Sequence, residues 1–188
     1  MKHLKAYKLF ENLNNPIRIE QFLAEINFPP ELRTQVESWW NQNRAEIRIH
    51  HFNFSSPQPI AGVFLGVDEI AINKRLPMPP HIKFFLALHE SGHCNQHRDG
   101  RFMAGYYDTV IAGNKPEFLR SYLELEIDAN DYAFNSLREM GLERLYQFEE
   151  PRLRGNQVAG EMVWRMMTAD IARLNPIDFI DLLKKQIM

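Results

Sequence analysis

The amino-acid sequence predicts an α+β fold, in which a small antiparallel three-stranded sheet packs against a helical core with helical extensions at both ends. Residues 46–73 contain three short stretches in which apolar and polar residues alternate, which is the pattern of β-strands. The segments before and after them have apolar residues at the three- and four-residue spacing of helices. Strands that follow one another and are flanked by helices are typical of an α+β domain.

The composition is that of an ordinary globular domain. The chain has 188 residues, which suggests one domain over residues 1–188, and its hydrophobic content of 45% is enough to bury a core. The net charge of -2 provides no basic surface, so nucleic acid is not an expected partner. The only cysteine, Cys94, cannot form an internal disulfide. Neither a signal peptide nor an apolar run of about 20 residues is evident, so we expect a cytoplasmic protein without a membrane span.

The N-terminal part, residues 1–45, is expected to be helical. Residues 4–13 and 17–27 have helical patterns that are separated by Asn14-Asn15-Pro16. A third helix is expected over residues 31–44. We interpret these helices as scaffold.

The middle part, residues 46–140, combines strands with two long helices. The three strands are expected at residues 46–54, 61–67 and 69–73, with a tight turn at Val67-Asp68. The last strand leads directly towards the next helix, so we expect it to form an exposed edge of the sheet; the alternative is a central strand that is paired on both sides.

Prolines then end the strand region and suit the first turn of a helix, which is expected over residues 81–97. A second long helix is expected over residues 117–140, where Gly141 ends it. Two or three shorter helices are expected in the C-terminal part, residues 141–188.

The first long helix contains the motif His89-Glu90-Ser91-Gly92-His93. Residues four apart share one face of a helix, with about 5–6 Å between their Cβ atoms, so His89 and His93 can converge on one metal ion. Glu90 is rotated by about 100° from His89, so it can accept a proton from a metal-bound water. Zinc lowers the pKa of such a water towards about 7. The motif therefore predicts a zinc site in which Glu90 is the general base for peptide hydrolysis.

The same motif also occurs without a metal, so its context is important. Residues 84–88, which precede it, are all apolar, as expected for a helix that passes through the core. Glycine destabilises a helix by about 1 kcal/mol relative to alanine, so Gly92 suggests that another element packs closely there. The alternative interpretation is two buried or surface histidines that bind no metal.

A catalytic zinc site needs a third protein ligand and one open position. Glu126, on the second long helix, lies in an apolar stripe that would face the core, and a buried carboxylate needs a partner or a metal ion. Asn130, one turn later, could hydrogen-bond a ligating histidine. We therefore predict Glu126 as the third ligand and retain Glu124, on a wetter face, as the alternative. The apolar stripe consists of Leu119, Tyr122, Leu123, Ala129, Ala133 and Leu137.

Together, the strands, the histidine motif and residues 126–133 resemble the ImmA/IrrE-type zinc metallopeptidases, which are small members of the gluzincin class. Their second motif typically reads E-x-E-A-N/D-x-F-A; here Asp128 replaces the second Glu and Tyr132 replaces Phe, and both changes keep the chemical type. The resemblance covers about residues 45–140. It implies a zincin-like core, zinc ligands at His89, His93 and Glu126, and Glu90 as the base. It also implies a protein or peptide substrate such as a repressor or regulator.

Several other residues are interpreted as structural. Cys94 is expected to be a buried thiol, and His97 a surface or helix-end histidine. His50 and His51 are adjacent on a strand, so only one is expected to face inward. The pair Tyr106-Tyr107 is expected to pack against other side chains, with stabilisation of an oxyanion as the alternative.

Three function classes remain open. The first is a zinc-dependent endopeptidase, and the intact Glu90 favours it. The second is a catalytically silent zinc-containing regulatory or interaction module of the same fold. The third is a helical nucleic-acid-binding protein, which the charge balance argues against. For the peptidase, we expect an extended substrate to pair with the exposed edge of the strand at residues 69–73.

Overall fold

The computed structural model describes residues 15–52, 62–66, 68–75, 77–101 and 115–147, together with residues 150 and 153. This part of the chain is α+β, as the sequence predicts, with five helices and three strands. Their bounds are α2 Ile19–Glu25, α3 Pro30–Asn43, β1 Arg48–Phe52, β2 Gly62–Gly66, β3 Glu69–Asn73, α4 Pro80–Arg98, α6 Lys115–Glu139 and α7 Glu143–Tyr146. The helix expected over residues 4–13 lies outside the described residues. Of the two or three shorter helices expected over residues 141–188, α7 is described, and residues 154–188 lie outside the described residues.

The three strands form a mixed sheet, so the expectation of an antiparallel sheet is wrong for one of its two strand pairs. The strand order is β1-β3-β2, with β1 parallel to β3 and β2 antiparallel to β3. Of the tight turn expected at Val67-Asp68, Val67 lies outside the described residues, and Asp68 has a positive φ of 61°, as is common in two-residue hairpin turns. Because β3 inserts between β1 and β2, it is the central strand, and the expectation of an exposed edge at residues 69–73 is also wrong.

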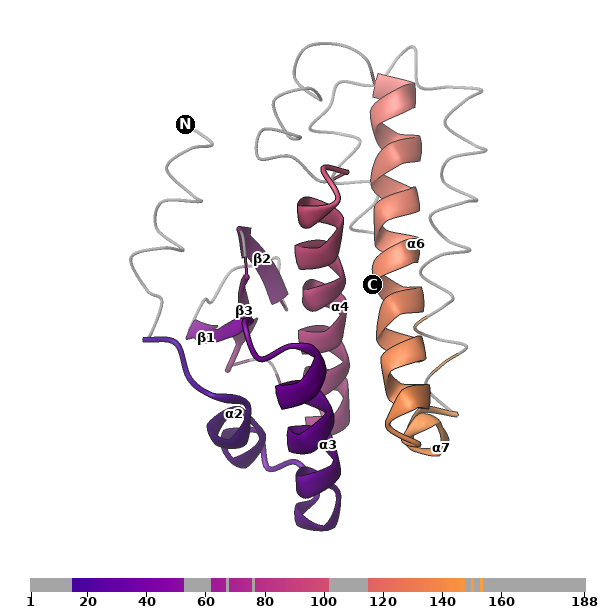
Figure 1. Cartoon of the computed structure of the whole chain (residues 1–188). Coiled ribbons are helices and arrows are strands. Elements are labelled where there is room, and N and C mark those ends of the chain that lie inside the picture. The colour runs from indigo at the N-terminus through magenta and orange to yellow at the C-terminus, as the bar shows by residue number, and fades with distance from the viewer. Residues whose placement is uncertain are drawn as a thin grey trace.

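Helix α4 lies between the sheet and α6, and it packs against both (Figure 1). A helix that is covered on two sides needs apolar residues around most of its circumference, which explains the apolar run at residues 84–88. Phe84, Phe85, Ala87 and Leu88 are all buried. Burial of each large apolar side chain stabilises the fold by about 1.5–3 kcal/mol. The motif helix is therefore part of the core.

The close approach of α4 and α6 depends on Gly92. A Cβ atom at this position would lie 3.0 Å from the Cα atom of Ala129 and 3.2 Å from the ring of Tyr132. Such distances are shorter than ordinary van der Waals contact, so any larger residue would push the two helices apart. The expectation of close packing at Gly92 is confirmed.

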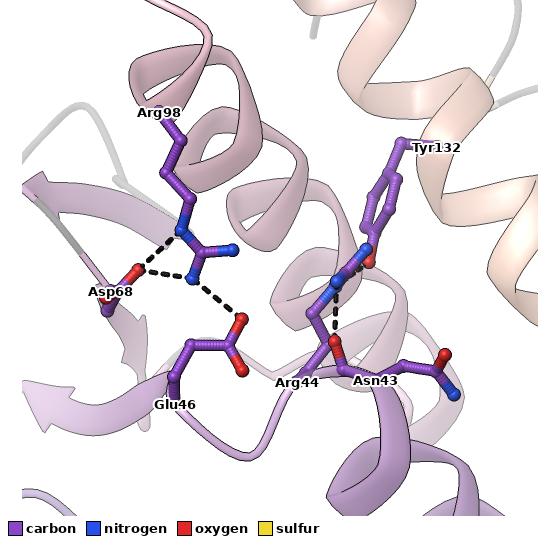
Figure 2. Close-up of polar contacts among 6 residues, drawn as sticks. All are labelled: Asn43, Arg44, Glu46, Asp68, Arg98 and Tyr132. Atoms are coloured by element: carbon purple, nitrogen blue, oxygen red, sulfur yellow. Dashed lines mark hydrogen bonds and ion pairs between the residues drawn. The ribbon is translucent and has the colours of Figure 1, made fainter.

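Polar contacts attach both long helices to the sheet region (Figure 2). Arg98, in the last turn of α4, donates to Asp68 in the β2–β3 turn at 3.0 Å and to Glu46 before β1 at 2.7 Å. Its positive charge also suits the C-terminal end of a helix. Arg44, directly after α3, donates to the hydroxyl group of Tyr132 on α6, and its guanidinium lies 4.7 Å from the ring centroid. These contacts connect α4 with the segments beside the strands, and α6 with the end of α3.

The structure also corrects the expectation for the two adjacent histidines on β1. His50 and His51 are both buried, with exposed fractions of 8% and 2%. The ring of His51 stacks on Phe22 of α2, with 5.5 Å between the ring centroids. Other elements thus cover both faces of β1, which the alternating pattern of a single strand cannot reveal. None of the described helices has the length and apolar character required to cross a membrane.

Candidate metal centre

The structure brings the three predicted ligand residues together at the contact between α4 and α6. His89 and His93 lie one turn apart on α4, and their Nε2 atoms are separated by 3.2 Å. Glu126 faces them from α6, with one carboxylate oxygen 3.1 Å from Nε2 of His89 and the other 3.5 Å from Nε2 of His93. The ligand atoms of all three side chains lie within 4.8 Å of one another.

These distances fit a zinc ion. Ligand atoms at about 2.0–2.1 Å from zinc, arranged tetrahedrally, are about 3.3–3.4 Å apart, and the three observed separations lie within a few tenths of an ångström of this value. Two imidazole nitrogens and a carboxylate also form a ligand set that zinc prefers in catalytic sites. The cluster can therefore hold one zinc ion without a large movement of the backbone.

Glu126 and Glu124 lie on different faces of α6, because they are two residues apart on a helix. Glu124 is exposed, whereas Glu126 contacts both histidines. The side chain of Glu126 is 31% exposed, so this carboxylate is partly buried. Asp128, on another face, pairs with Arg101.

The charges of the cluster are strongly coupled. Burial tends to raise the pKa of Glu126, but hydrogen bonds and charge interactions with His89 and His93 prevail and lower it. Burial tends to lower the pKa of His93, but the interactions with Glu126 prevail and raise it to about 9. The carboxylate is thus held ionised, which is the form that binds a metal.

Amide side chains bind the outer nitrogen of each imidazole. The Nδ1 atom of His89 lies 3.0 Å from Oδ1 of Asn130 on α6, which is the contact that the sequence suggested for Asn130. The Nδ1 atom of His93 lies 2.8 Å from Oε1 of Gln96 on α4. Gln96 is not among the residues predicted from the sequence, although its position three residues after His93, on the same helix face, could have indicated it.

Glu90 lies between α4 and β2. Its exposed fraction is 8%, and a backbone hydrogen bond connects it with Phe64. Burial raises its pKa, against the lowering effect of the neighbouring His89 and His93. A Cβ atom at Gly62 would lie 2.6 Å from Oε1 of Glu90, so the absence of a side chain at Gly62 makes room for this carboxylate. This role of Gly62 could not be predicted from the sequence, because no local pattern relates Gly62 to Glu90.

The remaining candidate residues do not join the cluster. Cys94 is buried, and burial raises the pKa of its thiol to about 12, as expected for a structural cysteine. His97 packs beside Phe64, with 5.5 Å between the ring centroids. The pair Tyr106-Tyr107 lies outside the described residues.

Comparisons with protein-family models, with curated proteins and with solved structures give no match for this chain. The interpretation of the site therefore depends on its geometry and chemistry.

The first prediction concerns zinc binding and its dependence on pH. We expect about one zinc ion per chain, since there is one ligand cluster. With a pKa of about 9, His93 is protonated at pH 7 in the metal-free protein, and zinc must displace that proton. The zinc affinity should therefore rise as the pH increases from 7 to about 9. Calorimetric titrations in buffers with different ionisation enthalpies will measure the released proton.

The matched control is His97→Gln, which removes a histidine of the same helix outside the cluster. This variant should release the same number of protons as the wild type. Zinc binding that is independent of pH over this range would contradict the proposed coordination by His93.

The second prediction separates the two glutamates. Glu126→Ala should weaken zinc binding by orders of magnitude, because it removes a ligand and the charge that faces both histidines. Glu124→Ala should bind zinc as the wild type does, because Glu124 is exposed. Competition with a chromogenic chelator measures both variants. A reversed order of the two affinities would show that Glu124 is the ligand.

Proposed function

We propose that this chain is a zinc-dependent endopeptidase that hydrolyses a protein or peptide substrate, similar in its core to the ImmA/IrrE-type metallopeptidases. The observation that carries the proposal is the position of Glu90. This carboxylate is buried next to both motif histidines and has a raised pKa, and no salt bridge to Lys or Arg holds it among the described residues. A group with these properties is suited to general acid–base catalysis.

The described residues would have different roles in the proposed reaction. A zinc ion held by His89, His93 and Glu126 would lower the pKa of water and polarise a peptide carbonyl. Glu90 would accept a proton from the attacking water and transfer it to the amine that leaves. The burial of Glu90 keeps bulk water away from that proton and raises the carboxylate's affinity for it.

The strand order favours β2 as the strand that would align the substrate. Because β3 is central, it cannot be the strand that pairs with the substrate. We assign this role to β2, which is an outer strand of the described sheet and lies next to Glu90. An extended peptide can pair its backbone with such an edge and so place one carbonyl group near the metal centre. This arrangement requires an extended segment of the substrate.

A catalytically silent zinc module of the same fold is less consistent with these contacts. Burial of a carboxylate is costly, and a site that only binds zinc has no use for Glu90. A nucleic-acid-binding function has no support in the net charge of -2.

The third prediction tests the general base. Glu90→Gln should retain zinc but lose hydrolysis, because an amide cannot accept the proton of water. Wild type and variant are incubated with zinc and a complex library of unfolded peptides, and new N-termini are labelled and identified by mass spectrometry. Cleavages by the wild type should be absent in the variant and present in Glu124→Gln. Equal cleavage by wild type and Glu90→Gln would eliminate Glu90 as the base.

The fourth prediction tests the contact between β2 and the base. Gly62→Ala places a Cβ atom 2.6 Å from the present position of Oε1 of Glu90, so the carboxylate must move. A displacement of about 1 Å can reduce turnover by about 100-fold. Zinc affinity should remain near that of the wild type, because the three atoms nearest to the added Cβ all belong to Glu90, which is not a predicted ligand. Full turnover on peptides identified in the cleavage screen would contradict this role for Gly62.

A further inference from the structure

Gln96 connects the two helices that carry the ligands. Its Oε1 atom lies 2.8 Å from Nδ1 of His93, and its Nε2 atom donates to the backbone carbonyl of Leu125 on α6 at 2.7 Å. The side chain is buried, with an exposed fraction of 4% for the residue. Leu125 directly precedes Glu126, so one amide group extends from one ligand to the residue next to another.

The contact with Leu125 determines how the amide is oriented. A backbone carbonyl can only accept a hydrogen bond, so the NH₂ group of Gln96 must face it. The amide oxygen of Gln96 must then face His93, and an amide oxygen can only accept. The proton of neutral His93 is therefore held on Nδ1, and the lone pair is on Nε2, the nitrogen that faces Glu126 and His89.

We propose that Gln96 is a positioning residue that sets the tautomer and the ring orientation of His93 for zinc binding. This inference rests on the proposed zinc site. Asn130 has the corresponding contact with His89, but it approaches from α6 and makes no described bond back to α4 other than that contact. Gln96 has the additional effect that it ties the orientation of His93 to the backbone beside Glu126.

A purely structural role for Gln96 makes a different prediction from a positioning role. If the bond to Leu125 only holds the helices together, every variant that loses this bond should lose stability and zinc affinity in parallel. If the bond to His93 is important for the metal, zinc affinity should follow the presence of an acceptor at position 96. The variants Gln96→Leu and Gln96→Glu separate these cases.

Gln96→Leu removes both hydrogen bonds at similar side-chain volume. Loss of a partner that orients a ligating histidine typically weakens metal binding by about 10- to 100-fold, and we expect a decrease of this size. Gln96→Glu retains a carboxyl oxygen that accepts from Nδ1 of His93, whether or not the carboxyl group is protonated. Its zinc affinity should equal or exceed that of the wild type.

The matched control is Gln35→Leu. Gln35, on α3, also donates from its amide nitrogen to a backbone carbonyl, that of Met140 at the end of α6, but it contacts no ligand residue. Its loss should lower the thermal midpoint without changing zinc affinity. All four proteins are titrated with zinc against a chromogenic chelator, and their thermal unfolding is measured in the metal-free form.

The outcomes separate this inference from the proposed function. A wild type that binds no zinc would overturn both. A wild type that binds zinc, with equal affinity in Gln96→Leu, would overturn the inference alone. Equal losses of zinc affinity in Gln96→Glu and Gln96→Leu would also overturn the inference alone. If Gln96→Leu does not fold, Gln96→Glu decides: retained affinity supports the positioning role, and lost affinity overturns it.

Discussion

The contact between α4 and α6 at Gly92 is the constraint on which the candidate site depends. Gly92 lies between the two motif histidines in the sequence, and Ala129 lies between Glu126 and Asn130. The close approach of the helices at Gly92, where an added Cβ atom would lie 3.0 Å from the Cα atom of Ala129, therefore coincides with the cluster of ligands. Small residues at the centre of the contact let the longer side chains around it converge on one point.

Two carboxylates near this contact have opposite electrostatic surroundings. Glu126 faces two histidines, which lower its pKa, whereas burial dominates for Glu90 and raises its pKa. Titratable groups whose environments push their pKa values apart commonly have different chemical roles. An ionised carboxylate suits a ligand, and a carboxylate with increased proton affinity suits a base. The difference arises from the elements that cover each group: α4 faces Glu126, and β2 covers Glu90.

The sequence predicts those parts of the site that depend on spacing within one helix. The interval from His89 to His93, the preference for Glu126 over Glu124 and the contact of Asn130 all follow from helical periodicity. Contacts between separate helices and strands cannot be predicted from the periodicity of one helix. The parallel pairing of β1 with β3 and the central position of β3 depend on how the chain folds back, and adjacent strands in the sequence suggested otherwise. The contact between Gly62 and Glu90 joins residues that no periodicity relates.

The number of protein ligands and their exposure distinguish a catalytic from a structural zinc site. A structural site normally has four protein ligands and is closed, whereas a catalytic site has three and an open position. Among the described residues the cluster consists of three side chains, and that of Glu126 is 31% exposed. The histidines are buried and held at their outer nitrogens by Asn130 and Gln96. Hydrogen bonds thus hold the imidazoles, the carboxylate of Glu126 is partly exposed, and the buried Glu90 lies next to the histidines. A zinc site that only stabilised the fold would need neither a partly exposed ligand nor a neighbouring buried carboxylate, so both features support the proposed hydrolytic function.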